Sequence, residues 1–146
     1  MADDYELRRI GAGDLGRLAE ADPRLADPAR AAHIGELLAA ELSWAAFDAG
    51  GALVGFAVVT RRFFGFPFVD LLVTAEAARR RGIGSALMGR CEAAHDADRI
   101  FTSTNESNAP MRALLSRDGW RPAGVIHYLD PGDPELVFVK LRAPGD

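Results

Sequence analysis

A run of three arginines followed by a glycine-rich turn makes one part of this sequence suited to binding an anion. Apolar residues at helical spacing come directly after it, so we expect a helix to begin at the turn. The first N–H groups of a helix have no partner inside it, and glycine lets a ligand approach them closely. A phosphate or pyrophosphate needs such donors beside positive charge. We therefore predict a phosphate-binding turn formed by Arg79, Arg80, Arg81, Gly82, Ile83, Gly84 and Ser85.

A second glycine-rich segment, Gly11 to Gly16, matches the spacing G-x-G-x-x-G of a dinucleotide-binding turn. The strand expected before it alternates apolar and polar residues, whereas the strand of a dinucleotide fold is buried on both faces. No second strand with a terminal acidic residue follows about 20 positions later. A strand-to-helix turn with Asp14 as the N-cap is the simpler interpretation. A nucleotide-binding module is the less favoured alternative.

The length and composition predict one domain spanning residues 1–146, because 146 residues with 49% apolar content suffice for a single core. The formal net charge of −4 gives no electrostatic reason to expect nucleic acid or an anionic membrane as a partner. No apolar run approaches the roughly 20 residues of a membrane-spanning helix, and the N-terminus lacks signal-peptide character. We therefore expect a cytoplasmic protein without a membrane partner.

Residues that bind metals or act as nucleophiles are sparse. His33 has no second histidine or cysteine at ligand spacing, so we expect a surface or boundary histidine and no metal site. Cys91, the only cysteine, excludes an internal disulfide and falls on the apolar face of its helix. A buried structural thiol is the expectation there.

The elements that position the predicted turn follow from periodicity and turn residues. The expected strands span 5–10, 44–48, 52–60, 68–74, 99–104, 120–128 and 135–141, and the expected helices span 14–20, 28–42, 83–95 and 108–119. Gly55 inside a strand suggests a bulge or a close backbone approach. The aromatic residues Phe63, Phe64 and Phe66 either line a substrate mouth or pack their hairpin on a neighbouring element.

Two stretches, taken with this order of elements, resemble the GNAT-type N-acetyltransferase superfamily. The first matches the family's acyl-CoA pattern R/Q-x-x-G-x-G/A at Arg79, Gly82 and Gly84. The second, from Asn108 to Gly119 and the following tryptophan, is similar to the family's asparagine, short helix and closing glycine-aromatic pair. The resemblance implies an α/β fold of the α+β type: a mixed, mostly antiparallel sheet of about six to seven strands, about four flanking helices and splayed central strands.

The resemblance also implies acetyl-CoA as co-substrate, no metal, and direct transfer of an acetyl group to an amine. In the family the pantetheine arm lies like an extra strand between the fourth and fifth strands, so backbone groups of Leu71, Leu72 and Val73 are implied to bind it. Asn108 is implied to contact the arm from the other side, with Asn105 as a further candidate. An N-cap role for Asn108 is equally compatible with its position. A homodimer is left open.

The acid–base residues follow the family pattern only in part. The tyrosine that often serves as general acid falls at Leu115, which cannot protonate a thiolate. A thiol pKa of about 8.5 makes the thiolate a tolerable leaving group without such an acid. An amine must lose a proton to attack, and Asp70 is the nearest candidate base, expected on the opposite strand face from Leu71 and Val73. A solvated or strand-pairing aspartate is the alternative.

Two questions of function therefore stay open. An acyl-CoA-binding module with little or no catalytic activity is the main alternative to an enzyme. The acceptor, a small-molecule, peptide or protein amine, is not identified, although the acidic balance favours a cationic or amine-bearing substrate. The acidic loop from Asp130 to Glu135 can help to recognise an amine, and a solvated hairpin loop is the simpler explanation for it.

Overall fold

A seven-stranded sheet forms the centre of the computed structural model, which describes residues 4–142. The strands are β1 (Tyr5–Ile10), β2 (Ser43–Asp48), β3 (Leu53–Phe63), β4 (Phe66–Thr74), β5 (Arg99–Asn105), β6 (Arg121–Ile126) and β7 (Glu135–Leu141). They lie in the order β1-β2-β3-β4-β5-β7-β6, and neighbouring strands are antiparallel except for β4 and β5. The predicted mixed, mostly antiparallel sheet is therefore confirmed.

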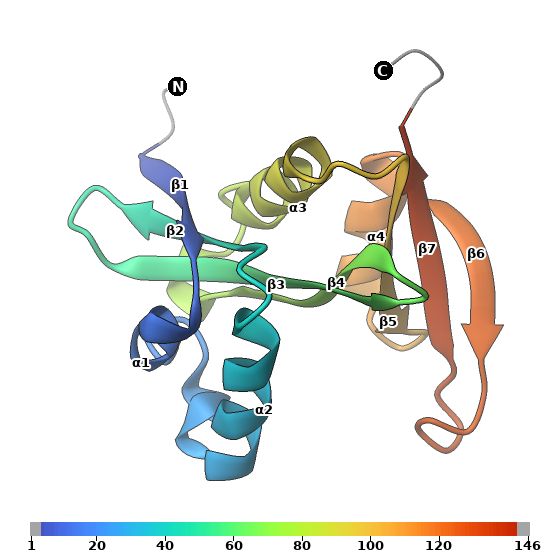
Figure 1. The fold of residues 1–146 in the computed structure, drawn as a ribbon, viewed down its shortest axis with the longest axis horizontal. Helices are drawn as coiled ribbons and strands as arrows, with labels where there is room; N and C mark the ends of the chain where they lie inside the picture. Colours follow the sequence, from blue (N-terminus) through green and yellow to red (C-terminus); the bar gives the residue numbers. More distant parts are fainter. Residues whose placement is uncertain (1–3, 143–146) are drawn as a thin grey trace.

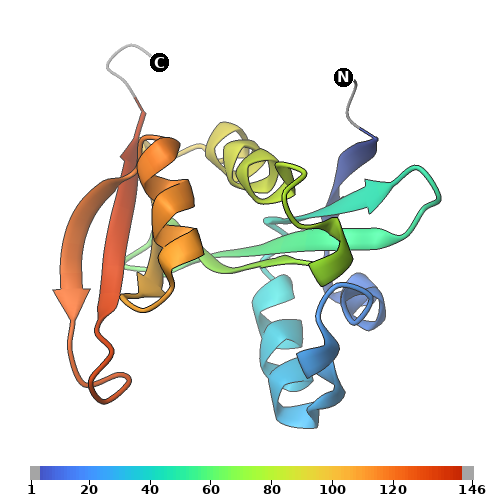
Figure 2. The same cartoon turned by 180° about the vertical axis from the view of Figure 1, so that it is seen from behind.

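The helices pack on both faces of this sheet. They are α1 (Leu15–Leu18), α2 (Pro28–Leu38), α3 (Ile83–Ala94) and α4 (Ala109–Arg117), with short 3-10 turns at Ala12–Asp14, Pro23–Ala26 and Glu76–Ala78. The helices α1 and α2 lie on one face, called here the α2 face, over a core that includes Ile34 and Phe56 (Figure 1). The opposite α3 face carries α3 and, beside β5 and β7, α4, whose Leu115 shares one core with Leu87 (Figure 2).

The first two helices are shorter than their patterns predict. α1 is a single turn, and Asp14, although at its N-cap position, makes no cap bond to it. The Asp14 carboxylate accepts the N–H of Gly11 at 2.9 Å instead. α2 begins as expected, with Asp27 accepting the Ala29 N–H at 3.1 Å, but it ends at Leu38 rather than at residue 42. The chain reverses there into β2, and Glu41 takes a left-handed φ of 57° to make the turn.

Gly55 and Cys91 have the structural roles that the sequence predicts. A Cβ at Gly55 would lie 3.0 Å from the Ile83 side chain and 3.0 Å from the Val73 carbonyl oxygen, so glycine lets α3 approach β3 closely. The pairing of β2 with β3 also shifts register next to it, as a bulge would. Cys91 is buried, and burial raises the pKa of its thiol to about 12. The thiol is therefore un-ionised near neutral pH and structural.

The segment from Gly11 to Gly16 does not have the surroundings of a dinucleotide site. β1 lies at the edge of the sheet and pairs with β2 in antiparallel fashion. A dinucleotide-binding turn joins a central parallel strand to a long helix, whereas this turn leads into the four-residue α1. In the part of the chain that the structure describes, no helix is long and apolar enough to cross a membrane.

Candidate functional site

β4 separates from its neighbour β5 after only two residue pairs. The pairs lie at Phe68 and Val69, and none follows on that side. On its other side β4 keeps pairing with β3 as far as Thr74. The backbone of residues 71–73 therefore borders an opening in the sheet, which confirms the predicted splay of the central strands. Because strand residues direct their N–H and C=O groups to alternate edges, at least one of these three presents both groups to the opening.

One extra residue in β4 marks the start of the opening. Val69 and Leu71 pair with consecutive residues of β3, so Asp70 between them is the extra residue of a β-bulge. Leu71 packs against the core of the α2 face, and Asp70 interacts electrostatically with His33 on α2. Both side chains therefore belong to the α2 face. The expectation that Asp70 lies opposite Leu71 and Val73 is wrong, because simple alternation allows for no bulge.

The Asp70 carboxylate is held in place at this bulge. Its side chain is only 11% exposed, and Oδ1 accepts the hydroxyl of Thr60 on β3 at 2.7 Å. The Arg62 guanidinium lies 4.0 Å from Oδ2. Burial raises the pKa of Asp70 above its usual value, and the Thr60 hydrogen bond and the charges of Arg62 and His33 offset only part of that rise. A carboxylate of raised basicity thus stands at the start of the opening.

The glycine-rich turn and the start of α3 lie next to this opening. Gly82 has a φ of 76°, a left-handed conformation that glycine adopts without strain, and α3 begins one residue later. Arg80 also takes a left-handed φ, at 69°, which is uncommon for an arginine and typical of functional turns. No side chain caps α3, so its first N–H groups are available to a ligand. The turn thus has the free N–H groups at a helix start that an anion-binding turn needs, and phosphate binding there stays a prediction.

Gly84 connects the turn to the opening. A Cβ there would lie 3.1 Å from Leu114 Cδ1 on α4 and 3.6 Å from Leu72 Cδ2 on β4. The second glycine of the pattern therefore lets the first turn of α3 sit directly against both elements. Since Leu72 borders the opening, the free N–H groups of α3 and the unpaired edge of β4 form one continuous surface.

The arginines of the turn differ in their surroundings. All three are exposed, and Arg81 forms an ion pair with Asp4. Within residues 4–142, Arg79 and Arg80 have no carboxylate partner and remain available.

A further arginine, Arg117, reaches the turn from α4. Its Nη2 donates to the Ser85 hydroxyl at 2.8 Å, on the first turn of α3. The sequence offers no signal for this cation, because 32 positions separate the two residues. Ser85 was predicted to belong to the phosphate-binding turn, and the structure brings to it, from another helix, a guanidinium that also lies 3.4 Å from the Asp118 carboxylate.

The two asparagines after β5 serve the local structure. Asn108 is the N-cap of α4, and its Oδ1 accepts the Met111 N–H at 3.2 Å. Asn105 donates through Nδ2 to Asp130 Oδ2 at 2.9 Å and to the Asp133 carbonyl at 3.3 Å. Asn105 therefore ties the end of β5 to the acidic loop between β6 and β7. Asn108 is exposed, and its amide nitrogen makes no hydrogen bond to the rest of residues 4–142, so it is free to contact a ligand.

Groups for acid catalysis or metal chemistry are few. Leu115 is fully buried in the core of the α3 face, so no proton donor stands at that position. Tyr128, after β6, is 97% exposed. Among residues 4–142, no three His, Cys, Asp or Glu side chains gather closely enough to hold a metal ion.

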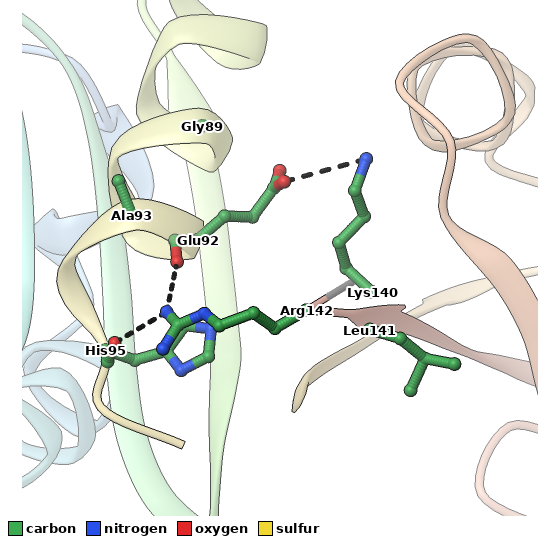
Figure 3. A pocket seen from close by; sticks show the side chains of 7 residues that line it. All are labelled: Gly89, Glu92, Ala93, His95, Lys140, Leu141 and Arg142. Atoms are coloured by element: carbon green, nitrogen blue, oxygen red, sulfur yellow. Dashed lines mark hydrogen bonds and ion pairs between the residues drawn. The ribbon is translucent and has the colours of Figure 1, made fainter. Parts of the chain in front are cut away.

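A separate cleft lies between α3 and the end of β7, with a volume of about 560 Å³ (Figure 3). Its Arg142, Lys140 and Glu92 already make contacts within the chain. Arg142 donates to the carbonyl oxygens of Glu92 at 3.3 Å and His95 at 2.8 Å, which caps the C-terminal end of α3. Lys140 lies 3.6 Å from the Glu92 carboxylate. These contacts fasten α3 to β7, and the candidate site is the opening between β4 and β5.

A mixed sheet that opens between two parallel neighbours, beside an uncapped helix with a glycine-rich start, is the architecture of an acyl-CoA-dependent acetyltransferase. The family model described as the acetyltransferase (GNAT) family matches residues 13–120. The chain belongs to the GNAT acetyltransferase family.

Solved structures share this fold over nearly the whole chain. A GNAT family acetyltransferase from Bacillus cereus is 25% identical, with a TM-score of 0.85 over 94% of this chain and 97% of that one. The ribosomal-protein-S18-alanine N-acetyltransferase from Escherichia coli is 16% identical, with a TM-score of 0.79 over 94% of both chains. Naa20 from Chaetomium thermophilum, solved with a bisubstrate analogue, is 22% identical, with a TM-score of 0.70 over 93% of this chain and 86% of that one. The last two likenesses concern the fold alone. No curated protein matches the chain in sequence.

Proposed function

We propose that the chain, as one domain over residues 1–146, transfers an acetyl group from acetyl-CoA to an amine. The observation that carries this proposal is the continuity between the unpaired edge of β4 at residues 71–73 and the uncapped start of α3. A long ligand with an anionic end and an amide-bearing arm fits such a surface. Its anionic end meets helix N–H groups and arginines, and its arm meets strand backbone.

The residues present fit acetyl-CoA as the co-substrate. The N–H groups of residues 80–85 would hold the pyrophosphate, with Arg79, Arg80 and Arg117 adding positive charge. Gly82 is open on its Cβ side, so its backbone is accessible. Leu71, Leu72 and Val73 would bind the pantetheine arm through backbone groups, and the amide nitrogen of Asn108 would contact it from the other side. When bound, acetyl-CoA supplies an acetyl group activated as a thioester.

Asp70 is the proposed base. An amine attacks only after losing its proton, and the Asp70 carboxylate stands where β4 leaves β5. Thr60 holds Oδ1 at 2.7 Å, which leaves Oδ2 to take the proton. Because burial raises the pKa of Asp70, this carboxylate is a better proton acceptor than an exposed aspartate. With Leu115 at the usual tyrosine position, the departing thiolate takes its proton from water.

An acyl-CoA-binding module with little or no activity is the second candidate, and the buried Leu115 is the observation that favours it. Thiol release from acetyl-CoA, measured against a panel of small amines and peptide N-termini, separates the two. Turnover on any amine supports the enzyme. Tight CoA binding by calorimetry without turnover on any acceptor supports the binding module.

The placement of the co-substrate has its own test. A carboxylate at Gly84 would intrude between Leu72 and Leu114 and repel a phosphate, so Gly84→Glu should abolish CoA binding. Gly16→Glu, in the other glycine-rich segment, is the matched control and should bind CoA normally, because a Cβ there meets no atom within 4 Å. If Gly84→Glu bound CoA as tightly as the original chain, the pyrophosphate would lie elsewhere.

A further inference from the structure

Four partly exposed phenylalanines form a ring cluster on the α2 face, where no helix covers the sheet, and the exposed Phe64 meets Phe63 edge to face at 5.1 Å. Phe63 stacks on Phe68 with 4.9 Å between ring centroids and lies 4.9 Å from Phe101. Phe66 meets Phe101 edge to face at 5.7 Å. All four are partly exposed, and none belongs to the core under α1 and α2 or to the core under α3 and α4. The hairpin between β3 and β4 thus packs on β5, and its rings remain open to solvent.

This aromatic face adjoins the candidate site directly. Phe68 pairs with Phe101 in the last part of the sheet where β4 and β5 touch, and the opening begins two residues further along. Phe68 also pairs with Thr60, whose hydroxyl holds Asp70. A molecule that presents an amine near Asp70 therefore has its remaining atoms over the rings.

The charges around the aromatic face differ between its two ends. At the opening, Asp70 stands on β4. Across the opening, on β5, the Ser103 hydroxyl donates to Glu135 Oε2 at 2.6 Å. If β4 and β5 continued to pair, Ser103 would lie opposite Asp70. The carboxylates of Asp70 and Glu135 therefore both border the opening. Arg62 lies at this same end, with its guanidinium 4.0 Å from Asp70 Oδ2, whereas Arg99 lies at the hairpin end, with its guanidinium 5.4 Å from the Phe66 ring centroid.

The charges at the two ends favour an acceptor with a single positive charge. Arg99 is neutralised by Asp98, 2.8 Å away. At the opening, Arg62 offsets one of the two carboxylates, Asp70, at 4.0 Å, which leaves a net negative charge there. An acceptor with one amino group gains from this net negative charge and from the rings, whereas the second positive charge of a polyamine would lie toward the hairpin end, where Asp98 is already paired with Arg99.

We propose that this face binds the acceptor, and that the acceptor is a monoamine whose amino group is carried on an aromatic or flat apolar arm. The arm stacks on the rings of Phe63, Phe68 and Phe101, and the amino group points toward Asp70 and Glu135. This assignment rests on the proposed function, because it takes residues 71–73 as the position of the reacting thioester.

The test compares two bisubstrate conjugates, in which the CoA sulfur is joined through an acetyl linker to phenethylamine or to spermidine. Calorimetry gives their affinities for the intact chain relative to CoA itself, with no need for turnover. We expect the phenethylamine conjugate to bind at least about 10-fold more tightly than the spermidine conjugate, in line with the value of aromatic contacts. Phe63→Ala should remove most of that difference while leaving CoA affinity unchanged. Tyr128→Ala, which deletes an exposed aromatic side chain outside the cluster, should preserve it.

The outcomes separate this assignment from the proposed function. If the chain prefers the phenethylamine conjugate but releases no thiol from acetyl-CoA with any amine, the proposed acceptor class stands and the proposed catalysis is refuted. Equal binding of the two conjugates, tighter binding of the spermidine conjugate, or a preference that survives Phe63→Ala would overturn the acceptor class. If Phe63→Ala fails to fold, Phe63→Leu keeps the apolar volume, removes the ring and serves as the same test.

Discussion

The Thr60 hydroxyl donates to Asp70 Oδ1 at 2.7 Å, and this bond joins β3 to the bulged residue of β4 at the point where β4 leaves β5. The bulge turns Asp70 toward the α2 face, and the bond fixes its carboxylate there. Thr60 engages one oxygen, and the other, 4.0 Å from the Arg62 guanidinium, is the one proposed to take the proton. The relationship links a local irregularity of the sheet to the proposed chemistry.

Replacing Asp70 tests its role as the base. Asp70→Asn keeps the shape and can still bond to Thr60, but the amide takes no proton, so kcat should fall about 100-fold or more. CoA affinity by calorimetry should stay unchanged, since the side chain faces the proposed acceptor side. Asp96→Asn, an exposed aspartate paired with Arg61, is the control and should keep full activity. If Asp70→Asn kept full activity, water and not Asp70 would accept the proton of the amine.

The pH dependence follows from the raised pKa of Asp70. Only its deprotonated form acts as base, so activity is lost as the pH falls through a pKa that burial holds above the usual aspartate value. The Thr60 hydrogen bond lowers that pKa, as do the charges of Arg62 and His33, so Thr60→Val should move the acidic limb to higher pH. The measurement is kcat/KM against pH for an amine that stays protonated throughout. The limb should be absent in Asp70→Asn.

Two glycines at the start and in the middle of α3 should respond in opposite ways. Gly82 has a φ of 76°, so Gly82→Ala forces an L-residue into the left-handed region at a cost of about 1 kcal/mol and disturbs the turn. Gly89 is helical with no atom within 4 Å of a Cβ, so Gly89→Ala should stabilise the chain by about 0.5–1 kcal/mol. Denaturant unfolding gives both values, and CoA affinity should fall for Gly82→Ala alone. Equal effects would mean that the turn conformation is unimportant.

The glycine turn and the order of elements are predictable because each depends on local chain properties: glycines suited to turns, periodic apolar residues and capping side chains. The splayed strands are expected only from the resemblance to the GNAT family. The sheet face on which Asp70 lies cannot be predicted in either way, because a single extra residue reverses the face of a strand side chain. No residue type in 68–74 indicates that a bulge occurs there. The Arg117 contact is hidden for another reason. It depends on how α4 packs beside α3, and the two residues that meet are 32 positions apart.

Arg117 should contribute to CoA affinity through the charge it brings to Ser85. Arg117→Ala should weaken CoA binding by about 3- to 10-fold, a modest effect because the guanidinium is exposed and screened by solvent. The salt dependence of binding should fall in the same variant. Arg112→Ala on the same helix, whose guanidinium bonds to the Glu106 carbonyl at 3.0 Å, is the matched control and should bind CoA normally. If CoA affinity fell equally in both variants, general positive charge on α4, and not the Arg117 contact with Ser85, would support binding.

The segment between α1 and α2 depends on one buried carboxylate, Asp22, which is 1% exposed and accepts bonds from Arg30 at 2.8 Å and Arg24 at 3.1 Å. Burial opposes its ionisation, but the two arginines outweigh it and lower the pKa of Asp22. Its stabilising effect is therefore present above the unfolded pKa of about 3.9 and is lost as the pH falls through the lower folded value. Asp22→Asn should cost about 3 kcal/mol in unfolding free energy near neutral pH. Asp27→Asn, which keeps a good N-cap on α2, should cost almost nothing. Equal losses in chemical denaturation would show that Asp22 acts as a cap rather than as the charged partner of Arg30.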